Sequence, residues 1–318
     1  MITSIAAFIL GLALLEVGAD WFTDKARELA QRAGVSETLA GLLTVGIEWE
    51  ELVVVLVAAL SGKPAVAVGD VIGSCIANLC GSLGIGVLAR PVPLERDDRR
   101  AGLAMLGVTA FVAALVWLGR GTISRPAGIL LIGLFAAYLV VLLVLFRRGV
   151  MVTLLQSDDD DEKTETRRGI ALASLGALGG LALVILGAEL VVRAAVELAK
   201  AWHISEFVVG VTLVAFGTTL PDTVINVVAA RKERGGLMIA NAAGSNICNL
   251  LFSLGVAAVI SPLAMGGLAF FDLLFLSSVT VLLVLALRGS RLVRVEGLAL
   301  VALYGGYLVY SFTFRGGR

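Results

Sequence analysis

Two short stretches decide the fold: Gly-Ile-Glu-Trp-Glu-Glu-Leu at residues 46–52 and Gly-Ser-Cys-Ile-Ala-Asn-Leu at residues 73–79. Both recur 171 residues later, as Gly-Thr-Thr-Leu-Pro-Asp-Thr at 217–223 and Gly-Ser-Asn-Ile-Cys-Asn-Leu at 244–250. Eight of the twelve residues from Gly73 to Gly84 are identical to their partners at this offset, without a gap. The sequence therefore predicts an internal duplication, and the duplicated motifs place acids, amides and hydroxyls inside otherwise apolar segments.

The composition excludes a soluble globular protein. Of the 318 residues, 58% are hydrophobic and 16% are charged, whereas the charged share of soluble domains is about a quarter. Many apolar runs reach the roughly 20 residues that a bilayer-spanning helix needs. We therefore expect an all-α polytopic membrane protein. The basic residues are scattered over short loops, which gives no indication of nucleic-acid binding.

The apolar runs predict ten transmembrane helices. Their expected ranges are 2–31, 36–61, 64–89, 101–119, 126–147, 169–200, 205–230, 235–262, 267–288 and 292–314. The loops after the odd-numbered spans carry 18 of the 25 Lys and Arg residues. Because loops rich in these residues stay in the cytoplasm, we expect both termini on the outside of the cell membrane.

Five spans in each copy give the two copies opposite orientations in the bilayer. We expect a first five-helix repeat at 1–150 and a second, inverted repeat at 169–318. The acidic segment 151–168 is predicted to be a cytoplasmic linker between them. Inverted repeats are typical of secondary transporters, whose binding sites lie at the repeat interface near the middle of the bilayer.

Carboxylates inside the predicted spans indicate a binding site. Each costs about 2.5–3.5 kcal/mol at the bilayer centre, even on the lenient insertion scale. The second span contains Glu48, Glu50 and Glu51, and the seventh contains Asp222. An ion pair within the bundle is the structural alternative, but no Lys or Arg lies near the middle of a span. Cation binding is therefore the interpretation that we favour.

Other oxygen-bearing side chains accompany these acids at helical spacing, which brings each set onto one helix face. Hard cations such as Ca²⁺ prefer such oxygens, whereas soft metals prefer thiolates and imidazoles, and neither kind of ligand converges in this sequence. The candidate ligands are Glu48, Glu51, Ser74 and Asn78 in the first copy and Thr218, Thr219, Asp222, Ser245 and Asn249 in the second.

Gly217 and Pro221 predict a break in the seventh span. Proline removes a backbone donor and clashes with the preceding turn, so carbonyl groups freed at the break could line a cavity. Asp70 is a further candidate, because it lies one turn before Ser74 and has Asn241 as its counterpart. Asp70 is interpreted either as a residue in a helix–helix hydrogen bond or as an additional proton or ion ligand.

The duplicated motifs Gly-Thr-Thr-Leu-Pro-Asp and Gly-Ser-Asn-Ile-x-Asn closely resemble the α-repeats of sodium/calcium exchangers in the cation/calcium antiporter superfamily. The resemblance covers nearly the whole chain and is strongest in the second copy. It implies a Ca²⁺ site shared with Na⁺ sites, and alternating access by two gating helices that slide past an eight-helix core. It further implies that Glu51 and Asp222 bind Ca²⁺ while the hydroxyl and amide side chains ligate Na⁺ or Ca²⁺. The expected partners are these ions and the lipid bilayer, with no cofactor and no enzymatic activity.

The first copy departs from the family pattern. Ile47 and Glu48 stand where Thr and Ser are expected, Glu50 replaces the helix-breaking Pro, and Cys75 replaces the Asn of Gly-Ser-Asn. An acid that the family often has at one of the two second-motif Asn positions is also absent. We hypothesise that Glu48 restores the missing carboxylate, so that the site keeps its charge in a different arrangement.

Three alternatives remain open from the sequence. The second copy has two more residues before its acidic motif, so Glu50 could occupy the position assigned to Glu51, although the 23-residue spacing to Ser74 favours Glu51. Loss of the hydroxyls could also remove a Na⁺ site, and proton-coupled Ca²⁺ exchange is therefore the alternative to exchange for Na⁺. An ion-binding membrane protein without coupled transport is a more remote alternative.

Overall fold

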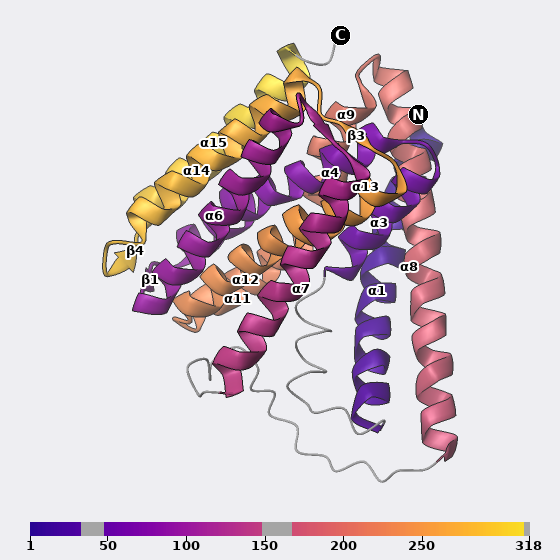
Figure 1. The fold of residues 1–318 in the computed structure, drawn as a ribbon, viewed down its shortest axis with the longest axis horizontal. Coiled ribbons are helices and arrows are strands. Elements are labelled where there is room, and N and C mark those ends of the chain that lie inside the picture. Colours follow the sequence, from indigo (N-terminus) through magenta and orange to yellow (C-terminus); the bar gives the residue numbers. More distant parts are fainter. Residues whose placement is uncertain (33–47, 148–166, 315–318) are drawn as a thin grey trace.

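Helices form nearly all of the structure. The computed structural model describes residues 1–32, 48–147 and 167–314, and its helices agree with the predicted spans to within a few residues at most ends (Figure 1). Nearly all of the predicted linker 151–168 lies outside these ranges, as does the first part of the predicted span 36–61.

The elements follow one another in a similar order in the two halves. The first half contains α1 (Ile2–Arg32), α3 (Trp49–Leu60), α4 (Pro64–Ile76), the π-helical segment η1 (Ala77–Leu83), α5 (Gly84–Ala89), β1 (Val92–Pro93), α6 (Arg96–Leu118), β2 (Thr122–Ile123) and α7 (Arg125–Arg147). The second half contains α8 (Arg167–Trp202), α9 (Glu206–Val209), the π-helical segment η2 (Gly210–Val214), α10 (Ala215–Thr218), α11 (Leu220–Arg231), α12 (Gly235–Cys248), the π-helical segment η3 (Asn249–Ser253), α13 (Leu254–Ile260), β3 (Leu263–Ala264), α14 (Gly267–Ala286), β4 (Arg291–Leu292) and α15 (Arg294–Phe314).

The offset of 171 residues also relates the bounds of several elements. Helices α3 and α11 both have 12 residues, and they begin at Trp49 and Leu220. Strands β1 and β3 begin at Val92 and Leu263, which are the same distance apart. The duplication read from the motifs therefore extends to the lengths of the elements around them.

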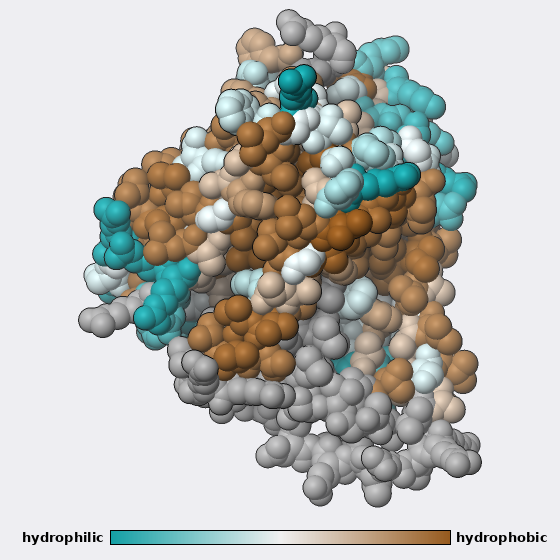
Figure 2. All heavy atoms as spheres, in the orientation of Figure 1, coloured by the Kyte–Doolittle hydropathy of each residue, from teal (hydrophilic) through white to brown (hydrophobic). Residues whose placement is uncertain are grey.

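The chain is a polytopic membrane protein. Among the described residues, eight helices are long and apolar enough to cross a membrane, or nine if the bent α9–α11 pair is one span. The described part of the predicted second span is the shorter helix α3. Large hydrophobic side chains cover the outside of the helices, and hydrophilic residues gather toward the ends of the bundle (Figure 2). Such a surface suits helices that face hydrocarbon.

The predicted break in the seventh span is confirmed. The helices on either side of Thr219 are bent by 45° relative to each other, and Pro221 lies in the first turn of α11. Proline fits there because the first backbone N–H groups of a helix have no intrahelical partner. In the second span, α3 begins at Trp49, directly after Glu48, the counterpart of Thr219.

Two short β-ladders join the halves, at opposite ends of the bundle (Figure 1). β1 pairs with β4 and β2 pairs with β3, both antiparallel. At the β1–β4 end, Arg90 forms an ion pair with Glu233. At the other end, Lys63 forms an ion pair with Glu206 at 2.8 Å. Loops after odd-numbered predicted spans thus contact one another at one end, and loops after even-numbered spans do so at the other.

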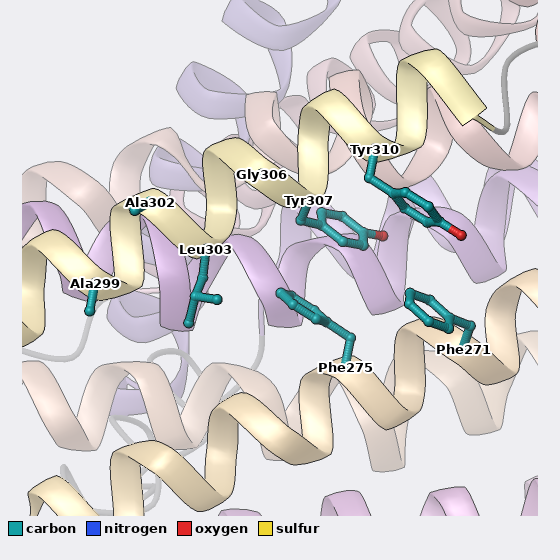
Figure 3. Close-up of a pocket in the computed structure, with 8 residues that line it drawn as sticks. All are labelled: Phe271, Phe275, Ala299, Ala302, Leu303, Gly306, Tyr307 and Tyr310. Carbon is teal, nitrogen blue, oxygen red and sulfur yellow. The ribbon is translucent and has the colours of Figure 1, made fainter.

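An apolar groove of about 540 Å³ separates α14 from α15 (Figure 3). Aromatic rings from the two helices meet along it, with centroids 5.1 Å apart for Phe275 and Tyr307 and 5.6 Å apart for Phe271 and Tyr310. None of the candidate ligands lines this groove. It therefore belongs to the outer surface of the bundle and not to the predicted site.

Close backbone contacts hold the centre of the bundle together, where α4 crosses η2. A Cβ atom on Gly69 would lie 2.6 Å from the carbonyl oxygen of Phe207, and one on Gly73 would lie 2.5 Å from that of Val211. Helices in lipid associate through such close approaches, since hydrocarbon gives them no hydrophobic drive to pack. Because Ser74 follows Gly73, this crossing also sets the position of a candidate ligand.

Replacing Gly73 with Ala should destabilise the protein, because the added methyl group overlaps the backbone of η2. Overpacking of this kind costs about 1–3 kcal/mol. Thermal denaturation in detergent, followed by size-exclusion chromatography, should show a lower midpoint. Gly107→Ala is the matched control, because a Cβ atom there meets nothing within 4 Å. Equal midpoints for the two variants would contradict the role of the crossing.

Candidate cation-binding site

Four helical segments meet at the centre of the bundle and carry the candidate ligands. In sequence order they are the start of α3, the α4–η1 junction, the α10–α11 break and the α12–η3 junction. Two come from each half of the chain, so every contact between the halves at this point joins residues that lie far apart in the sequence.

Three carboxylates converge there. One oxygen from each of Glu48, Glu51 and Asp222 lies within 4.8 Å of the others. Glu51 and Asp222 are buried, with 1% and 5% of their surface exposed, and Glu48 is half-buried. In the described part of the chain, no Lys or Arg forms an ion pair with any of them. The structure therefore brings together the two motif acids and the acid that replaces a family hydroxyl.

Neutral polar groups hold two of these carboxylates. Asn241 Nδ2 donates a hydrogen bond to Asp222 Oδ1 at 2.8 Å, and Ser245 Oγ donates one to Glu48 Oε1. Neither oxygen of Glu51 has a hydrogen-bond partner among the described residues. Buried polar atoms are nearly always paired in folded proteins, so the unpaired Glu51 carboxylate makes this residue a candidate ligand.

The predicted hydroxyl ligands bond to one another and to the backbone. Ser74 Oγ and Thr218 Oγ1 share a hydrogen bond of 3.3 Å, which links α4 to α10. Thr219 Oγ1 donates to the carbonyl oxygen of Ala215 at 2.9 Å, and Thr218 Oγ1 also approaches that oxygen at 3.3 Å. Threonine hydroxyls thus bond to the carbonyl oxygen of Ala215 just before the break, and the lining of a cavity by carbonyl groups freed there stays a prediction.

Both predicted amides lie where a helix changes its winding. Asn78 lies in the first turn of η1, and Asn249 begins η3. Such π-helical turns are frequent at functional sites, because they redirect side chains within a helix. Asn78 faces Asp222 but has no hydrogen bond of normal geometry, and Asn249 Nδ2 also lacks a partner among the described residues.

The structure separates Glu50 and Asp70 from the three-carboxylate group. Glu50 is half-buried and is not one of the three acids whose oxygens converge, although it is close enough to Asp222 to interact with it electrostatically. The geometry thus favours Glu51 over Glu50 at the motif position. Asp70 is fully buried in α4, one turn before Ser74.

Sequence reasoning missed several polar contacts around the site. Asn226 Nδ2 donates a hydrogen bond to Ser82 Oγ at 2.8 Å. Asn226 lies one helical turn after Asp222, and Ser82 lies one helical turn after Asn78. That i, i+4 spacing was the available signal. Glu16, a half-buried residue in α1, interacts electrostatically with Asp222, and its position in the middle of the first span was the corresponding signal.

Comparisons with known proteins identify the family. The model of the family described as "Sodium/calcium exchanger protein" matches residues 3–144 and 172–313. A membrane protein of Methanocaldococcus jannaschii is 30% identical over 306 residues, which make up 96% of this chain and 96% of the relative. Sodium/calcium exchanger MaX1 of Methanosarcina acetivorans is 28% identical, over 96% of this chain and 97% of its own length.

A solved structure agrees over the same extent. The sodium-calcium exchanger NCX_Mj, soaked with 100 mM Na⁺ and 10 mM Sr²⁺, matches with a TM-score of 0.63 and 28% identity, over 97% of this chain and 98% of that chain. Because the family model covers most of both halves and the fold agrees along the whole length, the chain belongs to the sodium/calcium exchanger family.

Proposed function

We propose that the protein is a secondary active antiporter that exchanges Ca²⁺, or a related divalent cation, for Na⁺ by alternating access. The observation that carries this proposal is the convergence of Glu48, Glu51 and Asp222 from both halves, without a basic partner among the described residues. Membership of the family and the name of its relative MaX1 support the choice of ions.

The geometry suggests which residues bind the divalent cation. Glu51 and Asp222 would bind the divalent cation from opposite halves, and Glu48 would supply the third carboxylate. Ca²⁺ takes 6–8 oxygens, so three carboxylates leave room for neutral ones. We propose that these come from the buried hydroxyls and amides of Ser74, Asn78, Thr218, Thr219, Ser245 and Asn249, of which Ser245 bonds to Glu48.

Inverted repeats at 1–150 and 169–318, joined by the linker 151–168, remain our proposal for the architecture. The equal offsets of the elements and the alternation of loop contacts between the two ends support it. With the basic loops in the cytoplasm, both termini and the turn at Ser61 would face outward, and the loop at Ser290 would face inward.

Labelling of single cysteines tests this topology. In a background without the three native cysteines, Ser61→Cys should react with an impermeant maleimide in intact cells. Ser290→Cys should react only after the membrane has been opened, because its loop lies on the other side. Both serines are exposed, so access depends on the side of the membrane. Labelling of both, or of Ser290→Cys alone, in intact cells would contradict the proposed orientation.

Proton coupling is the alternative that the site itself suggests. Glu48 occupies a position where the family has a hydroxyl, and its carboxylate accepts a hydrogen bond from Ser245. A carboxylate can carry a proton through the transport cycle, whereas a hydroxyl cannot do so at neutral pH. The replacement thus gives Ca²⁺/H⁺ exchange a specific structural basis.

Flux measurements should separate the two coupling ions. In proteoliposomes, an opposing Na⁺ gradient is expected to drive ⁴⁵Ca²⁺ uptake, because the oxygens of both halves together can bind Na⁺. A pH gradient without Na⁺ is the parallel arm, and protein-free liposomes are the control. Uptake only in the pH arm would establish proton coupling instead. No flux in either arm, with Ca²⁺ or other divalent cations, would overturn the antiporter proposal.

Substitution of the neighbouring glutamates tests which one binds the divalent cation. Glu51→Gln should raise the ⁴⁵Ca²⁺ concentration at half-saturation at least tenfold, because it removes a buried charge from the three-carboxylate group. A tenfold change corresponds to about 1.4 kcal/mol of binding free energy. Glu50→Gln should have a smaller effect, since that side chain lies outside the group. A larger loss for Glu50→Gln than for Glu51→Gln would reverse the assignment.

A further inference from the structure

The groove between α14 and α15 has no role in the proposed ion exchange. Its volume of about 540 Å³ lies within the roughly 300–1,000 Å³ of pockets that bind small ligands, and its walls are apolar or aromatic (Figure 3). Phe271 and Tyr310 in these walls are 45% and 38% exposed. Both helices are long and apolar enough to cross the membrane, so the groove opens to the hydrocarbon of the bilayer.

The surrounding helices hold the groove open. α14 packs against α6, whereas α15 packs against α5 and η1. The contact between α15 and α5 is close, because a Cβ atom on Gly297 would lie 2.9 Å from the carbonyl oxygen of Gly84. Since α14 and α15 are held by different neighbours, the space between them is part of the fold and is available to a partner.

Three arginines lie at the end of the groove where α14 is joined to α15. Arg288 follows α14, Arg291 lies in β4, and Arg294 begins α15, five residues before Ala299 in the groove wall. At 1.5 Å per residue, Arg294 and Ala299 are about 7.5 Å apart along the helix axis. All three arginines are exposed, and none forms an ion pair with an acid in the described ranges. The groove therefore leads toward positive charge that the described chain does not neutralise.

A phospholipid with an anionic headgroup matches both features. Its acyl chain is narrow and apolar, as the groove requires, and its phosphate oxygens suit guanidinium groups, which can bind them through two parallel hydrogen bonds. Basic residues beside membrane-spanning helices attract anionic lipids. In the orientation proposed above, the arginines also face the cytoplasm, where the surface of the membrane is negative.

A second copy of the chain fits this surface less well. Two copies that shared one orientation in the bilayer and packed through the groove would bring their arginines to the same end of the interface. Like charges placed opposite each other disfavour association. An anionic lipid would instead neutralise the arginines.

We propose that the α14–α15 groove binds an acyl chain of an anionic phospholipid whose phosphate group lies against Arg288, Arg291 and Arg294. The inference goes beyond the proposed function, because it concerns the outer surface and does not depend on which ions the protein carries. Since α15 packs against η1, which contains Asn78, the lipid would bind to a helix that supports the candidate cation site.

Native mass spectrometry of the purified protein tests the headgroup contact. Dioleoylphosphatidylglycerol should bind as one lipid per chain, roughly tenfold or more tightly than dioleoylphosphatidylcholine, because the acyl chains are identical and only the first lipid carries a net negative charge. The double variant Arg291→Gln/Arg294→Gln should lose most of this preference. Arg120→Gln/Arg125→Gln is the matched control and should keep it, because these exposed arginines flank β2 at the opposite end of the bundle.

Two neighbouring glycines test the groove itself. Gly306 lines the groove and Gly305 does not, and a Cβ atom on either would meet nothing within 4 Å among the described residues. Gly306→Leu should therefore fill the groove without overlapping the protein and weaken binding of dioleoylphosphatidylglycerol severalfold. Gly305→Leu should leave binding unchanged. Leucine also favours helix more than glycine does, so both variants should fold.

Several outcomes would contradict the lipid site. Equal affinity of the unmodified protein for the two lipids, or equal binding of dioleoylphosphatidylglycerol by the two glycine variants, would overturn the proposal. A dimer of the unmodified protein that Gly306→Leu dissociates would assign the groove to a second copy of the chain and would also overturn it.

Discussion

The structure depends on one electrostatic constraint: carboxylates at the centre of a bilayer-spanning bundle need positive charge from somewhere. The protein does not supply it from its own basic side chains within the described residues, where the ion pairs lie away from the central carboxylates. It surrounds the acids with amides and hydroxyls that orient them but do not neutralise them. In the function that we propose, mobile cations complete the site, and a site that needs mobile ions is suited to carrying them.

The scaffold serves this constraint by exposing backbone and side-chain oxygens in the interior without exposing them to lipid. Glycines at the α4–η2 crossing allow the helices to approach closely, which leaves no gap for hydrocarbon. The break at Thr219 and the π-helical turns at Asn78 and Asn249 interrupt regular winding only at the centre, where protein surrounds them. Irregular backbone at membrane depth is tolerated in just such protected places.

The sequence predicted the break and the spans that the structure describes, and it singled out the acids that converge at the centre, because each depends on a local signal. Apolar length marked the spans, Gly217 and Pro221 marked the break, and the repeated acids marked the centre. The contacts that depend on how helices face one another had no such signal. The Ser74–Thr218 bond joins residues 144 positions apart, and the π-helical turns leave the composition of a helix unchanged. The two-residue strands are also too short to show alternation.

The choice between Glu50 and Glu51 shows the same limit. Spacing in the sequence favoured Glu51, and helix geometry gives adjacent residues different directions, but only the assembled bundle shows which of the two faces Asp222. The deviation at Glu48 is similar. The sequence shows that an acid replaces a hydroxyl at this position. It does not show the hydrogen bond between Glu48 and Ser245, because these residues come from different halves of the chain.

The two β-ladders bear on how such a chain could have arisen. β1 and β3 occupy equivalent positions in the two halves, and β2 and β4 also occupy similar ones, so the β1–β4 and β3–β2 ladders are the same kind of contact made twice. Two identical surfaces that each offer both strands form a closed, self-complementary pair. An ancestor with a single copy of the repeat could have assembled as a symmetric dimer through these strands, and gene fusion would then have joined the subunits without creating a new interface. After fusion, each half was free to change alone, and the acids at positions 48 and 70 are the kind of one-sided change that a dimer of identical chains could not have made.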